Sequence, residues 1–320
     1  MGRLSRIKDL APGHDGIGFF LCSRKEVRQT RAGGDPFLSL TLQDVSGSID
    51  AKVFGADVER VRHEFDAGEF VKVEARTNVY NNRTELIVTR IRRVHPDQDA
   101  RDGFRAEDCV PTAPRSLDDM WTELETRTAA MDDAPLRALV TRVVTDHADR
   151  LRVWPAALTV HHAYRGGLIE HILQVARLVD AIGPMYDADT DLLFAGAVLH
   201  DIGKLRELEY DVAPAYSREG NLVGHIAIGL MMVREAAAGL QGLSEERRQE
   251  VEHLVASHHG SRELGSPVEP MTVEAFVLAM ADDLDAKLHQ VRRHVAADDN
   301  DGEFTAYSPR LKRVLLKPRA

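Results

Sequence analysis

The stretch AGAVLHDIGKL, residues 195–205, ends an apolar segment with a histidine and an aspartate side by side, His200 and Asp201. Neutral imidazole and carboxylate groups together are what a divalent-metal site needs. Further groups of these two kinds occur before and after the pair, at His171, His225, His258, His259, Asp282, Asp283 and Asp285. Because they are dispersed along the chain, the sequence predicts a site built between packed helices and not on one loop.

Helical periodicity predicts that several of these residues point inward. His258 follows Val251, Leu254 and Val255 at the i, i+3, i+4, i+7 spacing of one helix face. His171 shares a face with apolar residues in the same way. A single inward histidine is more often a core residue with protein partners, since a buried imidazole needs hydrogen bonds. The whole set, together with an inward aspartate, favours a metal site instead.

The carboxylates that follow can be sorted by the same argument. Asp282, Asp285 and His289 lie on one helix face at i, i+3, i+7. Asp282 is therefore the expected metal ligand. Asp285 is expected to contact a ligand residue without binding the metal itself. Asp283 points elsewhere, which is typical of a solvated or capping group.

Composition bounds the class of protein. The chain has 320 residues, 43% hydrophobic and 29% charged, which is typical of a globular protein of two domains. No apolar run approaches the ~20 residues that cross a bilayer, so no membrane partner is expected. The N-terminus lacks the apolar region of a secretory signal. Two cysteines without metal spacing, Cys22 and Cys109, favour a reducing, cytoplasmic setting.

Charge is unevenly distributed along the chain. The net charge is −10, but residues 1–95 carry 16 Lys and Arg against 13 Asp and Glu, and residues 304–320 carry five basic groups and no acidic one. A mildly basic front and a basic tail fit separate surfaces for a polyanion. The alternative is that these are ordinary solvated charges.

The chain changes from strand patterns to helix patterns near its first third. FLSLTL (37–42) and SIDAKVF (48–54) alternate with period two around turn residues, which predicts a small all-β barrel over residues 1–95. Residues 96–116 are polar with three prolines and are predicted to be a linker. Helical patterns then predict an all-α domain over residues 117–303, followed by the basic tail.

The pattern H…HD…H…HH…D resembles the HD-domain metal phosphohydrolases, in the longer form that can hold two metals. That resemblance implies that Asp201 bridges the metals and that a metal-activated hydroxide attacks phosphorus. Manganese is typical of the relatives, with iron, magnesium or zinc as alternatives. Lys204 could reach a phosphate oxygen, or could be a charge favoured near a helix C-terminus. The implied ligands are His171, His200, Asp201, His225, His258, His259 and Asp282.

Longer motifs resemble one particular family that contains this domain. PAALTVHHAYRGGLIEHILQVARL (155–178), the segment 257–287 and PFLSLTLQDVSGSIDAKVF (36–54) are similar to the YhaM-type 3′–5′ exoribonucleases. In that family an OB-fold precedes the HD domain, in agreement with the order of strands and helices. The resemblance implies a hydrolase that shortens single-stranded RNA, or DNA, from its 3′ end. His161 and His162 lie in the same motif and are assigned no role.

An OB-fold binds single strands through a basic groove and aromatic rings on which bases stack. On the faces of the two predicted strands that point away from the core, Phe37, Lys52 and Phe54 form the expected nucleic-acid surface. Alternatively, the two rings pack under loops or against the other domain.

Two other functions compete with exonuclease activity. The HD pattern alone would serve a phosphohydrolase of a small nucleotide, such as a cyclic nucleotide, a dNTP or an alarmone. A barrel that holds a strand argues against this function. A non-catalytic RNA-binding protein is the third candidate, and the complete ligand set argues against it. The sequence is compatible with a homo-oligomer and does not define the oligomeric state.

Overall fold

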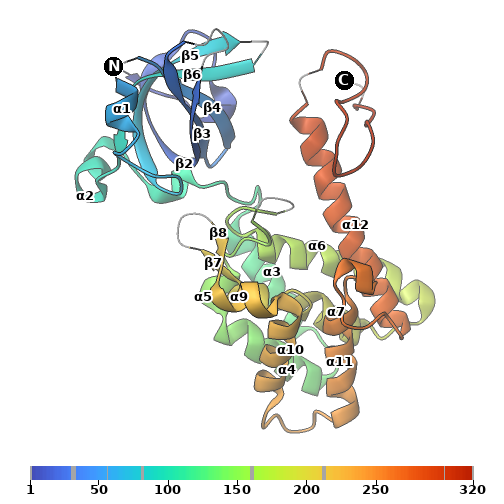
Figure 1. Ribbon diagram of the computed structural model, residues 1–320. Coiled ribbons are helices and arrows are strands. Elements are labelled where there is room, and N and C mark those ends of the chain that lie inside the picture. The colour runs from blue at the N-terminus through green and yellow to red at the C-terminus, as the bar shows by residue number, and fades with distance from the viewer. Residues whose placement is uncertain are drawn as a thin grey trace. The chain divides into compact units, whose positions relative to one another are not determined.

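The computed structural model describes residues 2–29, 34–55, 57–80, 83–158, 162–210, 214–298 and 300–318. The chain forms two compact units, the first ending at Thr112 and the second beginning at Ala113. The first is built from strands and the second mainly from helices, as the change of periodicity predicts (Figure 1).

The first unit is a closed barrel. Its sheet has the order β1-β2-β3-β4-β6-β5, and β2 pairs with β5 to close it. The pairs are antiparallel except β1–β2 and β4–β6. The short elements η1 (Ile7–Asp9) and α1 (Asp57–Val61) accompany the strands. The strands are β1 (Gly2–Arg3), β2 (Asp15–Gln29), β3 (Pro36–Asp44), β4 (Gly47–Val53), β5 (Phe70–Tyr80) and β6 (Arg83–Arg93).

The alternation in β3 and β4 decides which side chains fill the barrel. Leu38 lies opposite Val53, and Leu40 lies opposite Ala51. All four side chains are buried, and the residues between them face outward. The period-two pattern therefore correctly predicts both the strands and their inward faces.

The segment 96–116, predicted from the sequence to be a linker, is packed against the barrel in its first part. These residues form α2 (Pro96–Asp99), η2 (Ala100–Asp102) and η3 (Ala106–Cys109), which belong to the first unit. The Phe104 ring lies 5.4 Å from those of Phe19 and Phe70. The buried Asp99 carboxylate accepts hydrogen bonds from Arg92 and Lys72 of the barrel. One aromatic ring and one buried carboxylate thus fix a polar segment that has no periodicity.

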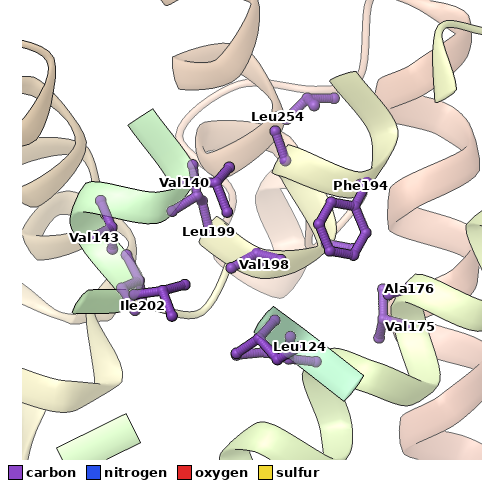
Figure 2. Close-up of a cluster of buried hydrophobic side chains, with 14 of the residues drawn as sticks. Leu124, Val140, Val143, Val175, Ala176, Phe194, Val198, Leu199, Ile202 and Leu254 are labelled. Atoms are coloured by element: carbon purple, nitrogen blue, oxygen red, sulfur yellow. The ribbon is translucent and has the colours of Figure 1, made fainter. Parts of the chain in front are cut away.

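The helices of the second unit pack around one apolar helix, α7. Every residue from Leu192 to Leu199 is buried, and α4, α6, α11 and α12 all pack against this helix (Figure 2). Asp189 caps it by accepting from the Leu192 backbone N–H at 2.9 Å. The helices are α3 (Leu117–Ala129), α4 (Ala134–Asp146), α5 (Ala148–Leu151), α6 (Gly167–Ile182), η4 (Gly183–Tyr186), α7 (Thr190–Leu199), α8 (Lys204–Glu207), α9 (Arg218–Val223), α10 (His225–Ala237), α11 (Glu245–Ser257), η5 (Arg262–Leu264) and α12 (Val273–Ala296).

Two features of the second unit go beyond the sequence expectation. A short hairpin, β7 (Leu208–Tyr210) with β8 (Pro214–Tyr216), interrupts the helices. The basic tail folds back on itself, with a bridge between Phe304 and Leu316 and an ion pair between Lys317 and Asp298 at 2.7 Å. Among the described helices, none combines the length and apolar character that a membrane span requires.

The reassigned segment 96–112 leads to a stability prediction. Phe104→Ala should destabilise the first unit by about 3–5 kcal/mol, because the ring is buried between Phe19 and Phe70. Hydrogen–deuterium exchange of β2 and β5 peptides should rise in this variant. Phe54→Ala, which removes a ring that is 46% exposed, is the control. Unchanged exchange in Phe104→Ala would mean that the segment is a linker after all.

Candidate metal centre

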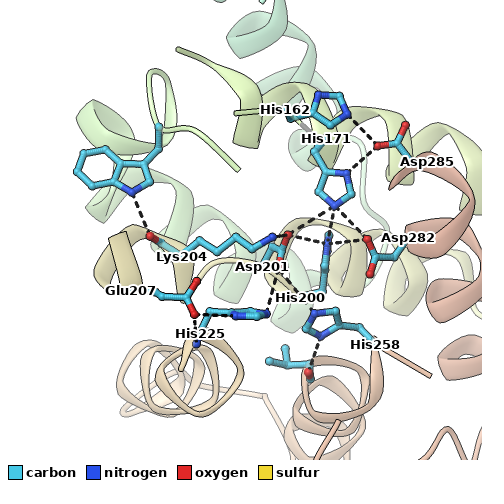
Figure 3. Close-up of polar contacts among 12 residues, drawn as sticks. His162, His171, His200, Asp201, Lys204, Glu207, His225, His258, Asp282 and Asp285 are labelled. Carbon is cyan, nitrogen blue, oxygen red and sulfur yellow. Dashed lines mark hydrogen bonds and ion pairs between the residues drawn. The ribbon is translucent and has the colours of Figure 1, made fainter. Parts of the chain in front are cut away.

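The seven residues predicted as metal ligands come together in the second unit, and we refer to them as the His/Asp cluster; Figure 3 shows all of them except His259. They come from five helices. α6 provides His171, the end of α7 provides His200 and Asp201, α10 begins with His225, the end of α11 provides His258 and His259, and α12 provides Asp282. The prediction of a site between packed helices agrees with this arrangement.

Local packing brings Asp201 to the start of α10. The His200 backbone N–H still donates to the Gly196 carbonyl at 2.9 Å, so the helix ends directly at the His-Asp pair. In the turn that follows, a Cβ on Gly203 would lie 1.9 Å from the His225 carbonyl oxygen. Only glycine permits this approach, and it places His225 beside Asp201.

The two oxygens of Asp201 face two different sets of histidines. Its Oδ1 lies 3.6 Å from His225 Nε2 and 3.7 Å from His258 Nε2. Its Oδ2 lies 3.5 Å from the Nε2 atoms of both His171 and His200. The cluster therefore divides into two groups with Asp201 between them. Asp282 joins His171 and His200 in the first group, and His259 joins His225 and His258 in the second.

The hydrogen bonds of the rings decide which nitrogen is available in each histidine. The Nδ1 atoms of His200, His258 and His259 lie 2.7–2.9 Å from backbone carbonyl oxygens. A carbonyl only accepts, so Nδ1 carries the proton in each ring and Nε2 carries the lone pair. His171 Nδ1 pairs with Asp285 at 2.7 Å, and His225 Nδ1 pairs with Glu207 at 3.0 Å.

Several acceptor atoms that face the cluster have no hydrogen-bond donor among the described residues. Asp201 Oδ1, His225 Nε2 and His258 Nε2 are buried and have no hydrogen-bond partner within the described residues. The His171 and His200 Nε2 atoms lie only 3.1 Å apart. Buried acceptors without partners are costly, and a cation between them removes that cost. The nitrogen and oxygen atoms of both groups are therefore suitable ligands for a divalent metal.

The electrostatics of the cluster favour a cation as well. Burial would raise the pKa of Asp201, but the Lys204 ammonium and the neighbouring His200 ring hold it well below its usual range. Burial likewise opposes ionisation of Asp282, and a hydrogen bond with His171 lowers its pKa instead. Burial would lower the pKa of His171, but Asp282 and Asp285 raise it to about 10. A dication would face the same carboxylates and replace that proton.

Lys204 lies against Asp201 and not at a helix end that needs a cation. It begins α8, and its Nζ lies 2.5 Å from Asp201 Oδ2. Its backbone carbonyl accepts from Trp154 Nε1 at 3.0 Å, which fixes the start of this helix. The side chain also borders the main cavity of the unit. The structure thus favours a role at the site over the helix-dipole interpretation.

A cavity of about 460 Å³ opens onto the cluster. One part of its wall is polar and includes Asp201, Lys204, His225 and Asp282. Asp283 also borders it, about half exposed and paired with Lys287 at 2.6 Å. The remaining wall is mostly apolar and is formed by Ala156, Ala157, Leu158, Leu208, Tyr216, Leu264 and Ala286. The cavity thus offers polar groups that suit an anion and apolar side chains that suit a flat apolar group.

Sequence reasoning missed three polar residues beside the cluster. Glu207 accepts from both the ring and the backbone N–H of His225. The position of Glu207, three residues after Lys204, could have indicated that it lies near the cluster. Glu170 and His162 are buried behind His171. Asp285, expected to support a ligand, contacts the His171 ring from outside the cluster.

The three residues predicted to bind nucleic acid lie together on the barrel. The Phe37 and Phe54 rings stack with centroids 5.3 Å apart. Phe54 is 46% exposed, so its ring is not covered within the first unit. Lys52 differs from the expectation of a free cation, since its Nζ pairs with Glu85 at 2.5 Å and lies over the Tyr80 ring.

Comparisons with known proteins agree with both units. A model of the HD domain matches residues 168–287, and a model of the OB-fold nucleic acid binding domain matches residues 24–94. These matches confirm the predicted fold class. The 3′–5′ exoribonuclease YhaM of Listeria innocua serovar 6a is 33% identical over 290 residues, which cover 90% of each chain. That of Bacillus subtilis strain 168 is 34% identical over 287 residues, 89% of each.

The shared position of Asp201 predicts how two substitutions will differ. Asp201→Asn should weaken divalent-metal binding at both groups by more than the ~10–100-fold that loss of an outer partner costs, because each of its oxygens faces one group. Asp282→Asn should weaken the His171–His200 group alone. Calorimetric titration of the metal-free protein with Mn²⁺ measures both effects.

Asp283→Asn is the matched control, because Asp283 pairs with Lys287 and is in neither group. If Asp201→Asn removes one binding event and leaves the other at its original affinity, Asp201 does not lie between two sites.

Proposed function

Because this chain belongs to the YhaM family of 3′–5′ exoribonucleases, we propose that it shortens single-stranded RNA from the 3′ end. It is a hydrolase with an HD domain and an OB-fold nucleic acid binding domain. The observation that carries the proposal is the pair of ligand groups that share Asp201, in one chain with a barrel that presents stacked aromatic rings.

The His/Asp cluster is the proposed site of two divalent metals, with manganese as the first candidate. Two such metals, when bound, supply Lewis-acid activation of a phosphodiester and of the attacking water. Histidine and carboxylate ligands also admit iron, magnesium or zinc. The protein contributes fixed ligand orientation, since each Nδ1 is already hydrogen-bonded to an oxygen and each Nε2 faces the cluster.

Lys204 is the proposed catalytic cation. Its ammonium is held at Asp201 Oδ2 and borders the cavity, where it can approach a nonbridging phosphate oxygen. Burial disfavours the charged lysine, but the charge of Asp201 outweighs this and raises the pKa of Lys204. The side chain therefore keeps its charge at neutral pH and can stabilise negative charge that develops on the phosphate.

The cavity suits a single terminal nucleotide. Its volume of about 460 Å³ lies within the ~300–1,000 Å³ typical of small-molecule pockets, which is too small for a duplex. The polar wall takes the phosphate, and the apolar wall with Tyr216 and Leu264 takes the base. A site that holds one nucleotide at a time is what stepwise removal from a strand end requires.

The barrel is proposed to hold the strand mainly by stacking. Phe37 and Phe54 offer an aromatic platform, while Glu85 already neutralises Lys52. Binding should therefore depend less on salt than in an OB-fold with an open basic groove. We further propose a cytoplasmic enzyme, in accord with the unpaired buried cysteines Cys22 and Cys109.

A labelled oligoribonucleotide tests the reaction. With Mn²⁺, the protein should shorten a 5′-labelled strand stepwise and release a labelled mononucleotide from a 3′-labelled strand at once. His200→Ala should lose this activity by several orders of magnitude with the fold retained, and Glu245→Gln, which changes an exposed carboxylate at the start of α11, should keep it. A metal-loaded protein that leaves RNA intact but hydrolyses a cyclic nucleotide or a dNTP would support a small-nucleotide phosphohydrolase.

The aromatic platform leads to a separate prediction. Phe54→Ala, in the inactive His200→Ala background, should weaken binding of single-stranded RNA by about 1–3 kcal/mol, the contribution of one base stacked on a ring. Fluorescence anisotropy at fixed ionic strength measures the affinity. Tyr186→Ala, which removes an exposed ring from the second unit, is the control. Unchanged affinity would assign Phe54 to packing.

A further inference from the structure

A chain of buried and partly buried polar groups lies behind His171, and Figure 3 shows its first members, Asp285 and His162. It runs from His171 through Asp285, His162 and Glu170 to Tyr164, and we call it the relay. None of its last three members is a proposed ligand. Their arrangement requires a separate explanation, because buried charged and polar groups are costly unless they are fully paired.

Asp285 connects the relay to the metal cluster. Its Oδ2 accepts from His171 Nδ1 at 2.7 Å and lies 3.1 Å from His162 Nε2. Asp282, one turn earlier in α12, lies 3.2 Å from the opposite nitrogen of His171. One helix therefore contacts both nitrogens of the same imidazole ring, which fixes the rotation of that ring.

His162 is held in place by its neighbours and against its own backbone preference. Its Nδ1 lies 3.1 Å from Glu170 Oε2, which also accepts from the Tyr164 hydroxyl at 2.5 Å. Its φ is +50°, a left-handed conformation that costs a non-glycine residue about 1–3 kcal/mol. A Cβ on Gly167 would lie 1.9 Å from the His162 carbonyl oxygen, so glycine is required there. The fold thus keeps His162 in a strained position.

The other ligand histidines have simpler supports. His200, His258 and His259 donate to carbonyl oxygens of their own local turns, and His225 pairs with Glu207 alone. Their orientation follows from local backbone geometry or from one carboxylate. His171 instead depends on a carboxylate that is shared with a second histidine, from a segment distant in the sequence. The two ligand groups are therefore supported in different ways.

We propose that His162 is a positioning residue that, through Asp285, orients His171 and sets the metal affinity of the His171–His200–Asp282 group selectively. A carboxylate behind a ligand histidine fixes its tautomer and increases its basicity, and losing such a partner costs about 10–100-fold in metal affinity. The rings of the His225–His258–His259 group are oriented by Glu207 and by backbone carbonyl oxygens, which are not members of the relay, so this group should keep its affinity when His162 changes.

A purely structural role explains the relay poorly. Well-packed apolar residues of similar volume usually stabilise a protein as much as a buried ion pair does, or more. Here two carboxylates, a tyrosine and a strained histidine are placed behind one ligand. The arrangement is explained by its effect on His171, because it directs the lone pair of that ring to the cluster.

The test is a Mn²⁺ titration of the metal-free full chain, by calorimetry and by thermal unfolding. His162→Phe keeps an aromatic ring and removes both contacts to carboxylates, and it should lower one of two binding affinities by about 10–100-fold. His294→Phe is the matched control, because it makes the same exchange in α12 at a ring outside the relay, whose Nε2 lies 2.9 Å from the Ala306 carbonyl oxygen. The control should bind both metals normally.

A double variant identifies the weakened site. In the Asp282→Asn background, which already weakens the His171 group, His162→Phe should leave the remaining site unchanged. Equal loss at both sites, or normal affinities with a lower unfolding temperature of the metal-free protein, would overturn the proposal and leave a structural role. The inference rests on the proposed metal pair. A wild-type protein that binds no metal refutes that pair, whereas two normal sites in His162→Phe refute only the positioning role.

Discussion

The buried carboxylate of Asp201 is the constraint on which the second unit depends. It is almost fully buried, and each of its oxygens faces imidazole nitrogens from different helices. An anion is stable in such a place only when cations or donors surround it. Lys204 supplies one cation at Oδ2, and the partnerless Oδ1 indicates a position for another. The packing of α6, α11 and α12 against α7, and of α10 against α8 and α11, brings the histidines within reach of this one residue.

Periodicity in the sequence predicts burial well, and it therefore finds residues whose function requires burial. Leu38 and Leu40 follow the strand period, and His258 follows the helix period of its apolar neighbours, so their inward directions could be predicted. The same pattern does not say which other buried group each residue meets. Periodicity indicated some of the seven candidates, the full set was named through the resemblance to the HD-domain phosphohydrolases, and its division into two groups needed the structure.

Several of the unpredicted features depend on partners that are distant in the sequence. Phe104 and Asp99 lie in a polar, proline-containing segment and gain their role from barrel residues. His162 and Asp285 are 123 positions apart and become neighbours only when α12 packs on α6. No local rule pairs such residues, because the free energy of each contact depends on burial that the rest of the fold creates.

Metal binding and folding of the second unit are coupled by the same groups. In the metal-free protein, His225 Nε2, His258 Nε2 and Asp201 Oδ1 are buried acceptors without partners, and each such group costs about 1–3 kcal/mol. The apolar core around α7 must offset that cost when no metal is bound. A bound metal removes the cost, so part of its binding free energy stabilises the fold. A site that must bind metal therefore makes the metal-free unit less stable, and the apolar, fully buried α7 is what allows the unit to fold without it.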